Sequence, residues 1–120
     1  MKNRLVLMTV LLGFSTFSHA SCEKGETTGY HLKNGKATPM EITVRECSAM
    51  DTASVDVEFG KKAFFYGSYT MQQDWRMTLN NEKAISVATP KQLPQNYECV
   101  TNKTLKRKKE AYCYVSLFLQ

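Results

Sequence analysis

The densest group of chemically active side chains is a basic segment near the C-terminus, residues 102–110. It places five cations within seven residues: Lys103, Lys106, Arg107, Lys108 and Lys109. Charges this close together attract phosphate, sulfate or carboxylate groups. We therefore expect residues 102–110 to contact an anionic envelope component or an acidic protein. The alternative is a solvated loop whose lysines protect the neighbouring strand from aggregation.

A second candidate contact surface is the aromatic run 63–69. In a strand, Phe65 and Tyr69 lie on the face opposite Phe64 and Tyr66. One of these faces must look away from a single core, so we name Phe65 and Tyr69 as candidate binding residues. A second packed layer over the sheet is the alternative explanation.

The residues needed for catalysis are sparse. After Ala20 the chain has one histidine, His31, whereas a hydrolase triad or a metal site needs several converging groups. Asp56 and Glu58 share a strand face, but a glycosidase pair needs a cleft and one carboxyl with a raised pKa. We expect no catalytic residues, no metal site, no cofactor and no enzymatic activity.

Four cysteines, Cys22, Cys47, Cys99 and Cys113, constrain both compartment and fold. An even number in an exported chain predicts two disulfides. Three pairings are open, and we favour Cys22 with Cys47 and Cys99 with Cys113 because each then joins neighbouring segments. Zinc is disfavoured because no close Cys-x-x-Cys pair is present. If Cys99 and Cys113 pair, the basic segment becomes the tip of a stapled hairpin.

The N-terminus has the pattern of a cleavable signal peptide, residues 1–20. Lys2 and Arg4 precede an apolar run over 5–14, and the small residues Ser18 and Ala20 fit a peptidase site. The run is too short for a permanent membrane helix, so we expect no transmembrane span. The predicted location is periplasmic or secreted. Lipidation at Cys22 is disfavoured, because His19 stands where lipoprotein signals usually have a leucine-like residue.

Charge and length limit the remaining domain, residues 21–120. The chain has 16 Lys and Arg and 11 Asp and Glu, and residues 1–20 hold two of the cations and no acid, which leaves 14 − 11 = +3. This excess is too small by itself to indicate nucleic acid, and we expect no nucleic-acid partner. The length suits a single disulfide-bonded domain.

The elements that must position these residues are predicted to be strands. Residues 21–39 are polar and rich in glycine, so we expect a loop with one short strand. After residue 39, seven runs rich in β-branched and aromatic residues are predicted to be strands: 40–46, 53–59, 63–69, 75–79, 84–88, 97–101 and 111–119. The pattern predicts an all-β antiparallel sandwich or barrel of about seven short strands, without separating the two.

The predicted core follows from the same alternation. Its members are Ile42, Val44, Val55, Val57, Phe59, Phe64, Trp75, Met77, Leu79, Ile85, Val87, Tyr97, Val115 and Leu117. Such a small core benefits from two disulfides, each worth roughly 2 to 4 kcal/mol.

Three classes of function remain open. The leading hypothesis is a small, exported, non-enzymatic binding protein. The first alternative is an inhibitor or immunity protein of a periplasmic or extracellular enzyme, because a rigid loop loses little entropy on docking. The second is a secreted effector or a subunit of a surface assembly, with residues 114–119 as an exposed strand edge. The sequence leaves the oligomeric state open.

Overall fold

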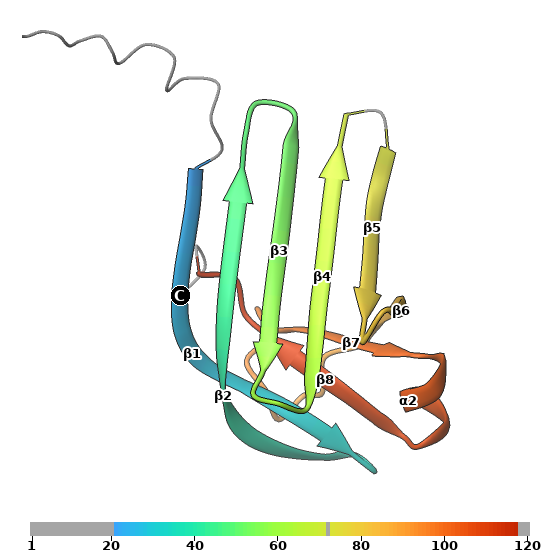
Figure 1. The fold of residues 1–120 in the computed structure, drawn as a ribbon. Coiled ribbons are helices and arrows are strands. Elements are labelled where there is room, and N and C mark those ends of the chain that lie inside the picture. The colour runs from blue at the N-terminus through green and yellow to red at the C-terminus, as the bar shows by residue number, and fades with distance from the viewer. Residues whose placement is uncertain (1–20, 72, 118–120) are drawn as a thin grey trace, which may run out of the picture.

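The computed structural model describes residues 21–71 and 73–117, so the predicted signal peptide lies outside the described residues. Over these described residues the chain is all-β, as predicted, with one short helix (Figure 1). The elements are β1 Ser21–Lys33, β2 Lys36–Ser48, β3 Thr52–Phe59, β4 Ala63–Thr70, β5 Gln73–Leu79, β6 Glu82–Val87, β7 Glu98–Asn102, α2 Lys103–Arg107 and β8 Glu110–Tyr114. The strands form a closed antiparallel barrel in sequence order, which decides between barrel and sandwich.

The extra strand is β1, where we expected mostly loop. It pairs with β2 along its whole length, from Ser21 opposite Ser48 to Lys33 opposite Lys36. The usual apolar alternation is absent because glycine occupies a tightly packed position. A Cβ on Gly29 would lie 2.7 Å from the Ile42 side chain and 2.8 Å from a backbone oxygen of β8. The loop prediction for 21–39 is therefore wrong.

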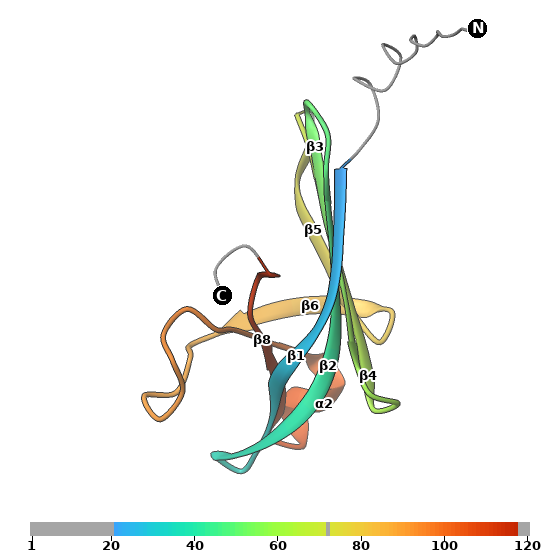
Figure 2. The ribbon, with the colours of Figure 1, turned by 90° about the vertical axis from the view of Figure 1, so that its left-hand side faces the viewer.

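The barrel is closed only in its lower half. β8 pairs with β1 at Tyr30 to Lys33, and β5 pairs with β6 only at Thr78 and Leu79. The upper halves of β1 to β5 continue beyond this closure as a projecting sheet, which we call the blade (residues 21–29, 41–48, 52–57, 66–70 and 73–77). Figure 2 shows the blade rising steeply above β6, which runs across it.

The main core fills the barrel. Its most buried members include Ile42, Val44, Val57, Phe59, Phe65 and Leu79. A second apolar cluster lies outside the barrel, where Leu93 and Tyr97 pack over β1 and β7 together with Val87 and Leu32. Most of the predicted core is therefore confirmed, although Val87 and Tyr97 belong to the outer cluster.

Three predicted core residues are exposed instead. Phe64 is 42% exposed because Phe65, its neighbour of opposite parity, points inward and is fully buried. Trp75 is 51% exposed because it stands on the blade above the barrel interior, and Ile85 points outward from β6 at 38%. The core assignment of Phe64, Trp75 and Ile85 is wrong, as is the assignment of Phe65 to a contact surface.

Both disulfides have the favoured pairing. Cys22 bonds Cys47 and Cys99 bonds Cys113, each pair with its Cα atoms 4.0 Å apart. In both cases the two cysteines lie directly opposite each other on neighbouring antiparallel strands. Among the described residues, no helix is long and apolar enough to cross a membrane.

In its described part, residues 114–117, the C-terminal run does not form the exposed strand edge that we expected. β8 ends at Tyr114 and is paired on one side with β1 and on the other with β7. Tyr114 and Val115 are buried, and residues 118–119 lie outside the described part of the chain. The physical reason is barrel closure, which uses both edges of this strand.

Candidate functional site

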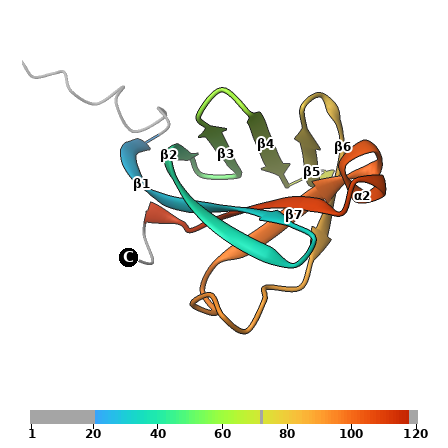
Figure 3. The same ribbon diagram turned by 90° about the horizontal axis from the view of Figure 1, so that it is seen from below.

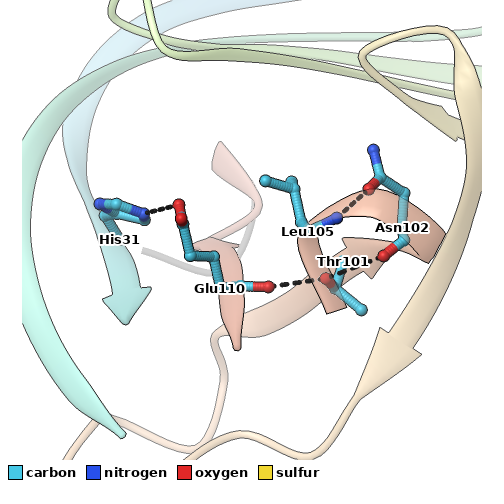
Figure 4. A network of polar contacts seen from close by, with 5 residues as sticks. All are labelled: His31, Thr101, Asn102, Leu105 and Glu110. Atoms are coloured by element: carbon cyan, nitrogen blue, oxygen red, sulfur yellow. Dashed lines mark hydrogen bonds and ion pairs between the residues drawn. The ribbon is translucent and has the colours of Figure 1, made fainter. Parts of the chain in front are cut away.

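The basic segment is held by a buried asparagine at its start. The side-chain oxygen of Asn102 accepts a hydrogen bond from the backbone N–H of Leu105 at 2.7 Å, which caps α2. Its side-chain nitrogen donates to the carbonyl of Leu79 at 2.7 Å, and Asn102 is only 1% exposed. Figure 4 shows this cap together with the neighbouring contacts of β8. The segment is therefore the tip of the stapled β7–β8 hairpin, as predicted, and it forms a capped helical turn there.

All five predicted cations point into solvent. Lys103, Lys106, Arg107, Lys108 and Lys109 are exposed, and no residue of α2 is buried. The turn after α2 closes through the N–H of Lys109, which donates to the carbonyl of Lys106 at 3.0 Å. The acidic neighbour Glu82 accepts hydrogen bonds from the Thr104 hydroxyl at 2.8 and 3.0 Å.

Two further turns bring lysines to the same end of the barrel. Lys33 and Lys36 flank the turn between β1 and β2, and the backbone N–H of Asn34 in that turn donates to the carbonyl of Lys109 at 2.9 Å. Lys62 belongs to the turn between β3 and β4, and it borders the hollows described next. Figure 3 views this end from below. We call it the basic end: Lys33, Lys36, Lys61, Lys62, Lys103, Lys106, Arg107, Lys108 and Lys109.

Two adjoining hollows lie within the basic end, and His31 and Lys62 line both. One, of about 550 Å³, also has Lys33 and Lys36 in its lining. The other, of about 430 Å³, has Lys108 in its lining. None of the exposed large hydrophobic side chains in residues 21–71 and 73–117 lines either hollow.

His31 forms a hydrogen bond with Glu110 between the two hollows. Its Nε2 lies 2.8 Å from Oε1 of Glu110 (Figure 4), and its ring stacks on Tyr112 with centroids 4.6 Å apart. The hydrogen bond from His31, with the nearby charges of His31, Lys33 and Lys108, lowers the pKa of Glu110 against the opposing effect of burial. Glu110 is thus kept ionised and paired at the basic end.

The predicted aromatic residues lie elsewhere. Tyr69 is 38% exposed on the blade, with its ring centroid 6.2 Å from that of Trp75. Phe65 is fully buried and packs on Tyr114 with centroids 5.2 Å apart, so it cannot touch a partner. The structure therefore brings the predicted basic residues together with each other but separates them from the predicted aromatic pair.

Four residues of the basic end and its hollows were not among the predicted site residues: His31, Lys33, Lys36 and Lys62. A usable signal was present for two of them, because Asn34-Gly35 is a strong two-residue hairpin turn and Lys33 and Lys36 flank it. The two turn residues have positive φ values of 54° and 81°. The approach of this turn to α2 depends on barrel closure, which local sequence does not report.

No protein-family model, curated protein sequence or solved structure matches this chain. Within residues 21–71 and 73–117, no three His, Cys, Asp or Glu side chains are grouped closely enough to hold a metal ion.

Proposed function

We propose that this is an exported, non-enzymatic binding protein whose basic end holds a phosphate-bearing polymer of the cell envelope. The observation that carries the proposal is the convergence of lysines from three separate turns around two adjoining hollows. A cluster of this kind contacts several anionic groups of one chain at once, which a single basic loop does less well.

The side-chain chemistry suits repeated phosphate groups. Eight of the nine cations that define the basic end are lysines, whose compact charges sit on flexible stems and adapt to varied spacing. The two acidic side chains that line a hollow, Glu82 and Glu110, are already engaged by Thr104 and His31. The exposed cations are therefore available to an external anion.

A polymer fits the basic end better than an acidic protein does. Protein interfaces are usually anchored by buried aromatic or other large side chains surrounded by a polar rim. The exposed large hydrophobic residues of the described chain do not line the hollows. Binding there depends chiefly on charge, and it weakens steeply as salt is added.

Export is supported by the two disulfides, since such bonds persist in oxidising compartments. A phosphate-bearing envelope polymer is accessible to a periplasmic or secreted protein. The predicted signal peptide supports the same location.

The direct test is titration of residues 21–120 with long-chain inorganic polyphosphate, followed by calorimetry at two salt concentrations. Replacing Lys106, Arg107, Lys108 and Lys109 by Ser should weaken binding at least about tenfold, through the loss of four contacts of modest energy each. Vesicles containing phosphatidylglycerol form a parallel arm. Tighter binding to vesicles than to polyphosphate would point to lipid head groups and contradict the polymer.

Two double variants that remove the same charge from different places show whether binding depends on the position of the cations or on net charge. Lys33→Ser with Lys36→Ser removes two cations from the basic end, whereas Lys24→Ser with Arg76→Ser removes two from the blade. The first should weaken polyphosphate binding more than the second. Equal losses would mean that net charge alone governs binding, and turnover of a hydrolase substrate by the pure protein would contradict a non-enzymatic role.

A further inference from the structure

The inner face of the blade, on the side that continues the barrel interior, carries carboxylates and apolar groups. Strand register places five residues in one row across it: Glu23, Glu46, Val55, Gly67 and Met77. Residues directly opposite each other in antiparallel strands project from the same face. The next row toward the tip holds Ser21, Ser48, Ala53 and Tyr69. Neither row contains a lysine or arginine.

An exposed aromatic pair lies on this inner face. Trp75 is 51% exposed, Tyr69 is 38% exposed, and their ring centroids are 6.2 Å apart. Gly67 makes room for the indole, because a Cβ on Gly67 would lie 3.4 Å from Cζ3 of Trp75 and 3.3 Å from Val55. The face of an electron-rich ring attracts a cation.

Where the blade meets the lower barrel, the inner face forms a hollow of about 570 Å³, which we call the corner cleft. Its lining includes Glu46, Val55, Trp75, Met77, Glu98 and Tyr114. Figure 2 shows the angle between the blade and β6 that produces this corner. No lysine or arginine of the described chain belongs to the lining.

The carboxylates of the corner cleft differ in how they are held. Glu46 accepts hydrogen bonds from the Ser116 hydroxyl at 2.9 Å and from the backbone N–H of Leu117 at 2.6 Å, so its position is fixed. Glu98 is exposed and accepts a long hydrogen bond of 3.4 Å from the Tyr114 hydroxyl. Burial, reinforced by the charge of Glu98, raises the pKa of Tyr114, which keeps that hydroxyl protonated as a donor.

The opposite face of the blade has a different charge pattern. Register places Lys24, Arg45 and Asp56 in one outer row, and Arg76 in the next. Arg45 pairs with Asp56 at 3.4 Å. Cations of the blade thus lie on the outer face, and the inner face is complementary to a positive group.

We propose that the corner cleft docks a surface loop of a partner protein that carries arginine or lysine beside an apolar side chain. The cation lies over Trp75, which lines the cleft together with Glu98, and the apolar side chain packs on Val55 and Met77. Aromatic anchors of this kind supply much of the energy of protein interfaces. The basic end of a second copy fits poorly, because its hollows lack an exposed large hydrophobic side chain to fill the apolar part of the cleft.

The corner cleft is independent of the proposed polymer site. Among the described residues, none that lines the cleft also lines a hollow of the basic end, and the blade rises on the side away from the lower turns (Figure 1). A negative binding result at one surface therefore says nothing about the other surface, and each needs its own ligand as a probe.

The test uses Trp75, the single tryptophan of the chain, as a fluorescent reporter. Residues 21–120 are titrated with a tryptophan-free peptide of three Arg-Leu repeats, and in parallel with one of three Glu-Leu repeats. The arginine peptide should change the Trp75 emission and bind at least about tenfold more tightly, as expected where charge complementarity acts at an aromatic surface.

Variants locate the binding. Glu98→Gln and Glu23→Gln, which remove exposed carboxylates, should each weaken the arginine peptide about threefold to tenfold. Glu58→Gln removes the same charge from an exposed position on the outer face of β3 and is the control, with an expected change below about twofold. Lys106→Ser in the basic end should leave the affinity unchanged or slightly raised.

Several results would overturn the docking proposal. Equal affinity for the two peptides would mean that apolar contact alone drives binding. Equal losses of affinity in Glu98→Gln and Glu58→Gln would mean that net charge alone drives it. A change in Trp75 emission on concentrating the protein alone would mean that a second copy fills the cleft. A response to neutral phosphatidylcholine vesicles, without one to the peptide, would assign the aromatic face to a lipid surface.

Discussion

At the scale of single residues, a part-buried hydrogen bond between His31 and Glu110 lies between the two hollows of the basic end. Glu110 is the acid of this pair, and it lies among many cations. His31 is held in place by stacking on Tyr112 of β8. The exposure of the five cations in 102–110 follows from local composition, because a dense charge run cannot be buried. The partner of His31 lies 79 residues away in sequence, so no local pattern could predict it.

The lowered pKa of Glu110 predicts an acid-dependent contribution to stability. A carboxyl whose pKa is lower in the folded chain stabilises the fold above its unfolded value of about 4.3, and this contribution is lost as pH falls through the folded value. Glu110→Gln keeps an acceptor but removes the charge, so we expect a loss of about 1 kcal/mol at pH 7 and a smaller loss at pH 3.

Urea unfolding at several pH values measures this difference. Glu41→Gln, at an exposed position of β2, is the control and should change the unfolding free energy by less than about 0.5 kcal/mol. A Glu110→Gln penalty that is the same at pH 3 and pH 7 would show that the charge of Glu110 contributes nothing.

Gly29 provides a second test at this scale. The added Cβ of Gly29→Ala meets Ile42 at 2.7 Å and the backbone oxygen of Cys113 at 2.8 Å, and backbone cannot yield cheaply. We expect a loss of about 2 to 3 kcal/mol in the unfolding free energy. Gly25→Ala, whose nearest contact is the flexible end of Leu117 at 3.3 Å, should cost less than half as much. Equal costs would mean that β1 does not pack as described.

At the scale of elements, prediction from sequence succeeded where the apolar alternation is regular. β3 alternates Val55, Val57 and Phe59 inward and was recognised directly. β1 was not, because glycines replace apolar side chains at its inward positions and the neighbouring strands fill the space. In β4, aromatic residues of both parities concealed which face is buried, and Phe65 was misassigned for that reason.

The two disulfides should differ in their contribution to stability. Chain entropy alone favours Cys22–Cys47 by roughly 0.5 kcal/mol, since it closes 25 residues against 14 for Cys99–Cys113. Burial acts in the other direction, because Cys99 and Cys113 are 2% and 0% exposed in the barrel, while Cys22 lies exposed in the blade. Replacing a buried pair by alanine also leaves a cavity.

We therefore expect Cys99→Ala with Cys113→Ala to lower the unfolding free energy by about 3 kcal/mol or more, and Cys22→Ala with Cys47→Ala to lower it by less. Urea titrations of both double variants against the oxidised chain measure the difference. The reverse order would show that the blade, rather than the barrel, limits stability.

At the scale of the whole molecule, function is expected to follow from a separation of charge. Barrel closure gathers turns that are far apart in sequence, and it places the lysines at the lower end and the carboxylates of Glu46 and Glu98 on the other side of the core. The sequence revealed the basic segment 102–110 but not the lysines that join it. Their convergence depends on the pairing of β1 with β8, which no short-range pattern encodes.

The most direct test of the basic end is an amide-resolved NMR titration of residues 21–120 with long-chain inorganic polyphosphate. The account predicts shifts at the turn residues 33–36, at 60–62 and at 103–109, all saturating with one affinity and all reduced together by added salt. Residues 66–70 and 73–77 of the blade serve as the internal control and should move little. Shifts confined to 103–109 would mean that the three turns do not act as one site. Shifts centred on the blade would contradict the assignment of the anion-binding surface.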